Sequence, residues 1–217
     1  MKPLILKDLY TQKLFGYLFP LFLLFPIYVN VMYAVSDFSF VALYVTYAAI
    51  WMSVYSNFGT AVLNRREQKL FASFPVTRKM IVQAKYCAAI MWWGIALASY
   101  GTLALLISIF MRNTVSFNGI TDLIVSLFVT LAAISIFYPL YFLVGYQISA
   151  FIAIALPMII FFILTFISID HENRGTMLVS IIPTDRPIII FSIIAACSII
   201  SYFSYKLSVI IFEKRKL

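Results

Sequence analysis

The stretch LIVSLFVTLAAISIFYPLYFLVGYQISAFIAIALPMIIFFILTFISI, residues 123–169, contains no charged side chain over 47 positions. A helix needs about 20 apolar residues to cross the hydrocarbon core of a bilayer, which is about 30 Å thick. The stretch is therefore too long for one crossing and suits two, with a turn near Val144, Gly145, Tyr146, Gln147 and Ser149. This pattern predicts a membrane-spanning pair of helices.

The composition of the whole chain agrees with this interpretation. Its 217 residues are 64% hydrophobic, 18% aromatic and only 11% charged, whereas a soluble domain is about half apolar and about a quarter charged. The chain lacks the polar side chains that would cover a soluble core. Soluble enzymes, disordered proteins and nucleic-acid-binding domains are therefore excluded. We predict an all-α integral membrane protein, with a single transmembrane domain over residues 1–217.

Charged residues divide the chain into further apolar runs. We predict six transmembrane helices, one cytoplasmic loop and one external loop. The helices are placed at 14–36, 39–63, 85–111, 122–143, 147–169 and 188–212, and the loops at 64–80 and 170–187. A cleaved signal peptide is the alternative for the first run, but its 23 residues exceed the usual apolar core of about 7–15.

The basic residues indicate how the chain is oriented. Thirteen of the 16 Lys and Arg residues fall on one side, in the N-terminus, the 64–85 region and the C-terminal end. Cytoplasmic segments carry such an excess, so we expect both termini in the cytoplasm. The same distribution accounts for the net charge of +8 without a nucleic-acid partner, because cations at the membrane edge are attracted to the anionic inner leaflet.

The N-terminal segment 1–13 alternates apolar and charged residues at helical spacing. Ile5 and Leu9 share one face, with Leu6 and Tyr10 beside it. We predict a short amphipathic elbow helix that lies flat in the cytoplasmic interface of the bilayer. The alternative is a solvated basic tail.

The cytoplasmic segment NRREQKLFASFPVTRKMIVQAK, residues 64–85, is the most informative part of the chain. As a helix it places Glu67, Phe71 and Phe74 together, and Pro75 ends that helix. Thr77 is suited to cap a following helix that continues into the third crossing. Apolar residues exposed to the cytosol require a groove on a partner or the membrane surface, and shallow insertion into the lipid interface is the alternative.

The run LFASFPVTRKMIVQAKY, residues 70–86, resembles the stretch after the second transmembrane helix of ABC-2 type permease subunits. The positions that carry the resemblance are Glu67, Leu70, Phe74, Pro75, Val76, Thr77, Arg78, Ile81, Val82, Ala84, Lys85 and Tyr86. The elbow, the six crossings and the long second-to-third loop are also similar to this family and to its type V exporter-like architecture. The short six-helix form resembles Gram-positive permeases that export phenol-soluble modulins or antimicrobial peptides.

The resemblance implies that the second-to-third loop forms a coupling helix on a separate ATPase. The implied ATPase-coupling residues are Arg65, Arg66, Glu67, Lys69, Leu70, Phe71, Phe74 and Pro75. No Gly is followed by Lys, so the phosphate-binding loop GxxxxGK[ST] is missing from this sequence. We therefore expect a chain that is not an enzyme by itself and holds no cofactor or metal, with ATP and Mg²⁺ on the partner ATPase.

The second crossing, 39–63, has two different faces. Tyr44, Tyr47, Trp51 and Tyr55 recur on one side, and small or hydroxyl residues recur on the other. One interpretation is a substrate path, for which Asn30, Tyr44, Tyr47, Trp51, Tyr55 and Asn57 are candidates. The alternative is lipid-facing aromatic residues beside a packed helix seam.

Together these features favour the permease subunit of an ATP-driven exporter in a bacterial plasma membrane. The expected partners are two cytosolic ATPase subunits, a second like or similar permease copy, the lipid bilayer and an amphipathic or hydrophobic peptide substrate. A membrane scaffold or sensor that recruits a cytosolic partner through the same loop is one alternative, and an ATP-independent facilitator is another. The sequence leaves open whether the role is secretion or resistance.

Overall fold

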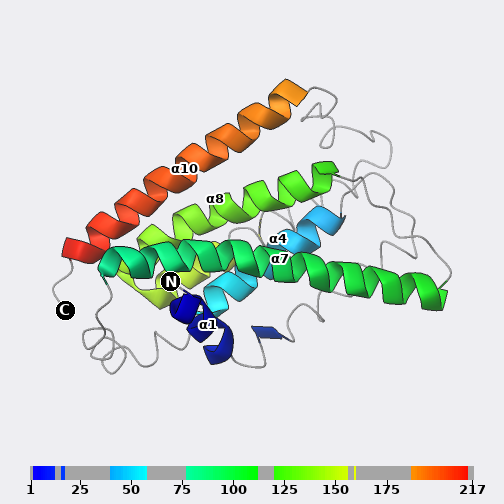
Figure 1. The fold of residues 1–217 in the computed structure, drawn as a ribbon, viewed down its shortest axis with the longest axis horizontal. Coiled ribbons are helices and arrows are strands. Elements are labelled where there is room, and N and C mark those ends of the chain that lie inside the picture. Colours follow the sequence, from blue (N-terminus) through cyan, green and yellow to red (C-terminus); the bar gives the residue numbers. More distant parts are fainter. Residues whose placement is uncertain are drawn as a thin grey trace.

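A computed structural model of the protein describes residues 2–12, 16–17, 40–57, 77–111, 120–155, 159 and 187–214. These residues form the helices α1 (Lys2–Thr11), α4 (Phe40–Tyr55), α7 (Arg78–Met111), α8 (Ile120–Val144) and α10 (Pro187–Lys214) (Figure 1). A further helical segment, Tyr146–Ala155, follows α8. The described part of the chain is thus helical, in agreement with the predicted all-α class.

Three helical stretches within the described ranges are long and apolar enough to cross a membrane. They are Arg78–Leu106, Leu123–Val144 and Ile194–Lys214. α8 and α10 begin and end within two residues of the crossings expected at 122–143 and 188–212. The crossings expected at 14–36 and 147–169 lie mostly outside the described residues, so the count of six stays a prediction.

α7 begins at Arg78, directly after Thr77, which was expected to cap a helix that continues into the third crossing. The backbone N–H of Met80 donates to the carbonyl oxygen of Thr77 at 2.9 Å and lies 3.4 Å from its Oγ1, as expected for a helix N-cap. The crossing itself was placed at 85–111, and α7 extends beyond it into the segment 64–80, because a charge such as Lys85 marks a membrane edge without ending a helix.

The expected turn after the fourth crossing is at Gly145. Its φ of 104° is a left-handed conformation that glycine adopts without steric cost. The N–H of Gly145 donates to the carbonyl oxygen of Tyr141 at 3.2 Å, which is the αL pattern that ends many helices. The chain then enters the segment Tyr146–Ala155.

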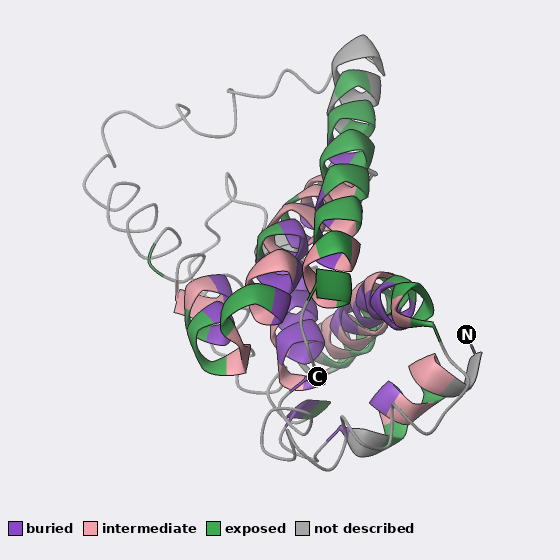
Figure 2. Cartoon of the chain, turned by 90° about the vertical axis from the view of Figure 1, so that its left-hand side faces the viewer, coloured by how far each residue is buried: buried purple, intermediate pink, exposed green. Residues whose placement is uncertain are grey.

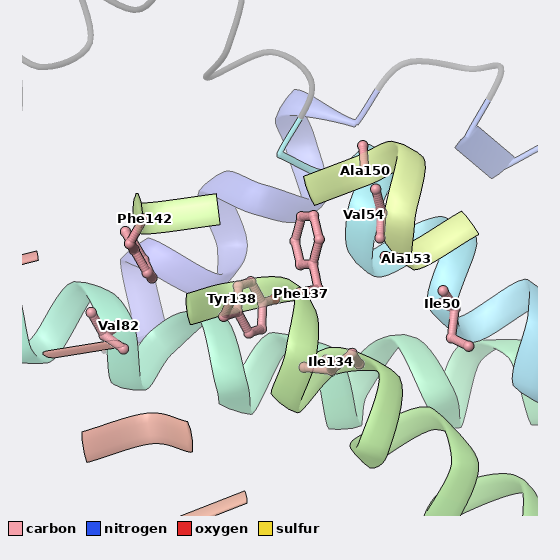
Figure 3. Close-up of a cluster of buried hydrophobic side chains, with 10 residues drawn as sticks. Ile50, Val54, Val82, Ile134, Phe137, Tyr138, Phe142, Ala150 and Ala153 are labelled. Atoms are coloured by element: carbon pink, nitrogen blue, oxygen red, sulfur yellow. The ribbon is translucent and has the colours of Figure 1, made fainter. Parts of the chain in front are cut away.

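α7 contacts each of the other labelled helices. It packs against α4, α10, α1 and α8, while α4 and α10 also pack on α8. Side chains from α4, α7, α8 and Tyr146–Ala155 meet in one apolar cluster (Figure 3). Its buried members are Ile50, Val54, Val82, Ala89, Ile134, Phe137, Tyr138, Phe142, Ala150 and Ala153.

α10 has its polar face inward and its apolar face outward. Cys197, Ser204 and Ser208 are buried against the other helices, whereas Phe203 and Leu207 are exposed, and Figure 2 shows exposed residues along most of this helix. Lipid tails are as apolar as leucine, so small and hydroxyl residues are favoured between membrane helices. The pattern is that of a helix whose inner face packs on other helices and whose outer face contacts lipid.

Candidate functional site: a polar junction at one end of the bundle

Three chain segments come together at one end of the fold: α1, the start of α7 and the end of α10 (Figure 1). A buried ion pair joins the first two. Nζ of Lys85 lies 2.8 Å from Oδ1 and 2.7 Å from Oδ2 of Asp8, and the two side chains are only 8% and 5% exposed. Removing ions from water costs several kcal/mol each, so buried charges persist when paired. The pair therefore fixes α1 to α7.

The residues on α1 explain how Asp8 reaches Lys85. Asp8 and Gln12, one helical turn apart, are buried, and Leu9 packs against Met52, Ala88 and Trp92. Tyr10 is 82% exposed on the outward side. An acidic residue thus points inward beside the apolar face predicted around Ile5 and Leu9. An outward aromatic residue suits a helix in the membrane interface, although that location stays a prediction.

Tyr138 connects the ion pair to α8. Its hydroxyl donates to the backbone carbonyl oxygen of Lys85 at 3.0 Å, and its side chain is 1% exposed. One buried tyrosine therefore links α7 and α8 directly beside the ion pair.

Tyr86, the next residue on α7, makes an equivalent connection to α10. Its hydroxyl lies 2.6 Å from Oγ of Ser204 and 3.2 Å from Oγ of Ser208. Ser204 in turn donates to the carbonyl oxygen of Ser135 on α8 at 2.6 Å. The rings of Tyr86 and Tyr138 are 4.9 Å apart, so the two sets of contacts adjoin.

Arg78, the first residue of α7, holds the end of α10. Its Nη1 donates to the carbonyl oxygens of Phe212 at 2.9 Å and Glu213 at 3.0 Å. The last carbonyl groups of a helix have no partner within that helix, and a cation there also complements the helix dipole. We refer to these polar side chains as the polar junction: Asp8, Arg78, Lys85, Tyr86, Tyr138, Ser204 and Ser208.

The segment 58–76 connects the end of α4 to the start of α7. It follows Asn57, which is 0% exposed and donates from Nδ2 to the carbonyl oxygen of Ser53 at 2.7 Å, and it precedes Thr77, the cap of α7. The predicted ATPase-coupling residues Arg65, Arg66, Glu67, Lys69, Leu70, Phe71, Phe74 and Pro75 all fall in this segment, outside the described residues.

The candidate path residues on α4 occupy different surroundings. Tyr44 is buried and packs on Tyr100 of α7, with ring centroids 5.5 Å apart. Trp51 and Tyr55 are half-buried and stacked, with centroids 5.9 Å apart. Tyr47 is half-buried. Asn57 is buried just after α4, and Asn30 falls outside the described residues.

The opposite face of α4 is a packed seam. Thr46, Ala49 and Ser53 are buried, and Oγ1 of Thr46 donates to the carbonyl oxygen of Ser126 on α8 at 3.3 Å. Among the residues that the structure describes, no three metal-ligating side chains gather at one place. The chemistry available at these positions is hydrogen bonding, ion pairing and aromatic contact.

Sequence reasoning missed the Asp8–Lys85 pair. Both residues had been counted only as charges on one side of a membrane, Asp8 in the elbow and Lys85 at the edge of a loop. Two signals pointed toward it: Asp8 adjoins the Ile5–Leu9 face at helical spacing, and Lys85 belongs to the motif that carries the permease resemblance. Neither signal specifies that α1 packs beside the second turn of α7.

Comparison with known proteins gives one result for the chain as a whole. A family model described as ABC-2 family transporter protein matches residues 3–213. No curated protein and no solved structure matches the chain. The matched range includes every residue of the polar junction and the whole segment between α4 and α7.

Proposed function

The chain belongs to the ABC-2 family of transporter proteins, and from that membership we propose that it is the permease subunit of an ATP-driven exporter of amphipathic peptides. It is a membrane protein of an ABC transporter, and its family is normally the non-enzymatic subunit that associates with an ABC ATPase. In the proposal, two ATPase subunits bind ATP and Mg²⁺ and act on two permease copies in a bacterial plasma membrane.

The observation that carries the proposal is the position of the two ends of segment 58–76. Asn57 at one end is fully buried and donates to the Ser53 carbonyl oxygen of α4, and Arg78 just past the other end holds the carbonyl groups of Phe212 and Glu213. A segment that binds an ATPase at its middle would therefore act on α4 at one end and on the contact between α7 and α10 at the other. This is the arrangement that conversion of ATPase movement into helix movement requires.

Movement would pass to α7 directly, because α7 begins just after segment 58–76, which we call the coupling segment. A helix is a rigid element, and rigid elements that slide or rotate against packed neighbours are a common means of switching between two states. Arg78 and Lys85 in the first turns of α7 attach α10 and α1 to it. Closure of the ATPases would then shift α7 relative to α4 and α8, and change the access of the substrate path.

The proposed substrate class is supported by the aromatic residues of α4. Trp51 and Tyr55 are stacked and half-buried, and Tyr47 is half-buried. Such side chains offer a broad apolar surface with a polar group at one end. A peptide with one apolar and one polar face matches this chemistry, and the resemblance of the short six-helix form to peptide exporters favours the same class.

The test is reconstitution of the chain with an ABC ATPase from its own genome in proteoliposomes, using a dye-labelled amphipathic helical peptide as the probe. We expect the ATPase to remain bound, and the peptide to cross the membrane only when Mg-ATP is supplied. Peptide movement without ATP would instead indicate a facilitator. ATPase binding with no peptide movement would indicate a scaffold.

The coupling segment supplies the matched variants for that test. Glu67→Ala and Phe71→Ala should each weaken ATPase binding and peptide movement together. Lys214→Gln, an exposed position at the end of α10, should leave both unchanged. Equal activity in all three variants would contradict the assignment of residues 65–75 to ATPase coupling.

A further inference from the structure

We propose that Asp8 and Lys85 are positioning residues for transport, and that their ion pair makes α1 move together with the coupling segment. This inference rests on the proposed function, because it assigns a part in ATP-driven movement to a contact outside the coupling segment. It differs from a stabilising role, in which the pair would only hold the resting fold together.

The geometry favours one rigid unit formed by α1 and the first turns of α7. Both carboxylate oxygens of Asp8 lie within 2.8 Å of Nζ of Lys85, so the contact is direct and two-fold. The hydroxyl of Tyr17 also donates to the carbonyl oxygen of Leu9 at 2.9 Å. Leu9 itself packs against Ala88 and Trp92 of α7. Ionic and apolar contacts therefore act on the same two helices.

The position of Lys85 along α7 places the pair close to the applied movement. Lys85 is seven positions after Arg78, the first residue of the helix, which corresponds to about 10 Å along the axis at 1.5 Å per residue. A displacement of the coupling segment reaches Lys85 within two helical turns. α1 must then follow α7, or the buried pair must break.

The energetics of buried ion pairs argue for a specific role. Replacing a buried pair by apolar residues of similar volume is often neutral or stabilising, whereas removing one partner is strongly destabilising. An apolar pair would hold α1 in place as well as Asp8 and Lys85 do. The ionic contacts of Asp8 and Lys85 depend on direction, however, and such contacts are suited to keeping two moving helices in a fixed register.

The same comparison provides the experiment. The double variant Asp8→Leu/Lys85→Met replaces the ion pair by an apolar contact, and Lys79→Met is the matched control at an exposed lysine of the same helix. Each is reconstituted with the ATPase and the dye-labelled peptide. The measured quantity is peptide moved per ATP hydrolysed, with thermal unfolding recorded in parallel.

We expect the double variant to unfold at the wild-type temperature and to hydrolyse ATP, while the transport ratio falls about tenfold, within the range of typical coupling free energies. Lys79→Met should retain the wild-type ratio. A double variant with a wild-type ratio would show that the pair is structural only, and would overturn the inference. Absence of ATP-driven movement in the wild type would overturn the proposed function, and the inference with it.

A second measurement applies even where the double variant does not fold. Spin labels on Tyr10→Cys and Lys79→Cys, in a chain whose Cys87 and Cys197 have been replaced, report the distance between α1 and α7. In the full complex this distance should be the same without nucleotide and after trapping with ATP and vanadate. A distance that changes on trapping would contradict the rigid unit.

Discussion

Arg78 and Phe212 are 134 positions apart in the chain, yet Nη1 of Arg78 lies 2.9 Å from the carbonyl oxygen of Phe212. Its guanidinium carbon is also 5.7 Å from the centre of the Phe212 ring, close enough for a cation–π contact. The beginning of α7 thus caps the end of α10. Arg78 lies directly after the proposed coupling segment, and loss of the cap that it forms can be measured at the end of α10.

Substitution of Arg78 should release the last turn of α10. Arg78→Gln removes the cation and the two hydrogen bonds to Phe212 and Glu213, and we expect a loss of about 1 kcal/mol in stability. Hydrogen exchange of the backbone amides of residues 209–214 in detergent micelles should accelerate. Lys79→Gln, one position further on and exposed, is the control. Equal exchange rates in the two variants would disprove the cap.

Single substitutions in the Asp8–Lys85 pair should be far more damaging than the double apolar replacement. Asp8→Asn leaves Lys85 buried without its counter-charge, and Lys85→Met does the same to Asp8, so each should cost about 3–5 kcal/mol. Asp8→Leu/Lys85→Met should recover most of that loss. Thermal unfolding in detergent gives the comparison. Additive losses in the double variant would mean that the two charges do not interact.

Tyr138→Phe should destabilise the fold without creating a cavity. The variant keeps the ring that packs against Phe137 and Tyr86 and removes only the hydroxyl that donates to the Lys85 carbonyl. We expect a loss of about 1 kcal/mol. Tyr202→Phe, at an exposed tyrosine of α10, should have no effect in the same unfolding assay. A similar effect at both positions would contradict the role of the Tyr138 hydroxyl.

Two glycine substitutions should change stability in opposite directions. A Cβ atom at Gly145 or at Gly94 would meet no atom within 4 Å, so only the backbone distinguishes the two sites. Gly145 has a φ of 104°, and Gly145→Ala should cost about 1 kcal/mol through this left-handed conformation. Gly94 lies within α7, and Gly94→Ala should raise stability by up to about 1 kcal/mol. Unfolding in detergent measures both.

Local signals in the sequence were sufficient for some helices of the described regions. Uncharged runs located α8 and α10, and Gly145 located the turn after α8. They did not locate the end of α4, which stops at Tyr55 although the second crossing was placed at 39–63. The start of α7 required a different signal, since Thr77 and not the charge of Lys85 determines it. Hydropathy detects where a helix meets lipid, whereas caps determine where the helix begins.

The polar junction could be predicted only in part. Membership in the permease family was recognised from residues 70–86, and that motif contains Arg78, Lys85 and Tyr86. Their partners, Asp8, Phe212 and Ser204, are more than 75 positions away in sequence. Such pairings depend on which helices are neighbours, and a single sequence specifies helix faces without specifying neighbours. The aromatic face of α4 was visible, but the burial of Tyr44 against Tyr100 was not.

The length of α7 has a consequence for the surrounding lipid. Its 34 residues extend for about 50 Å, while the hydrocarbon core measures about 30 Å. Even at the largest tilt seen for membrane helices, about 40°, roughly two turns must lie outside the hydrocarbon core. Arg78 and Lys79 make the first residues of α7 suitable for this polar environment. Bilayer thickness should therefore determine how much of α7 extends beyond the core, and transport activity should differ between thin and thick membranes.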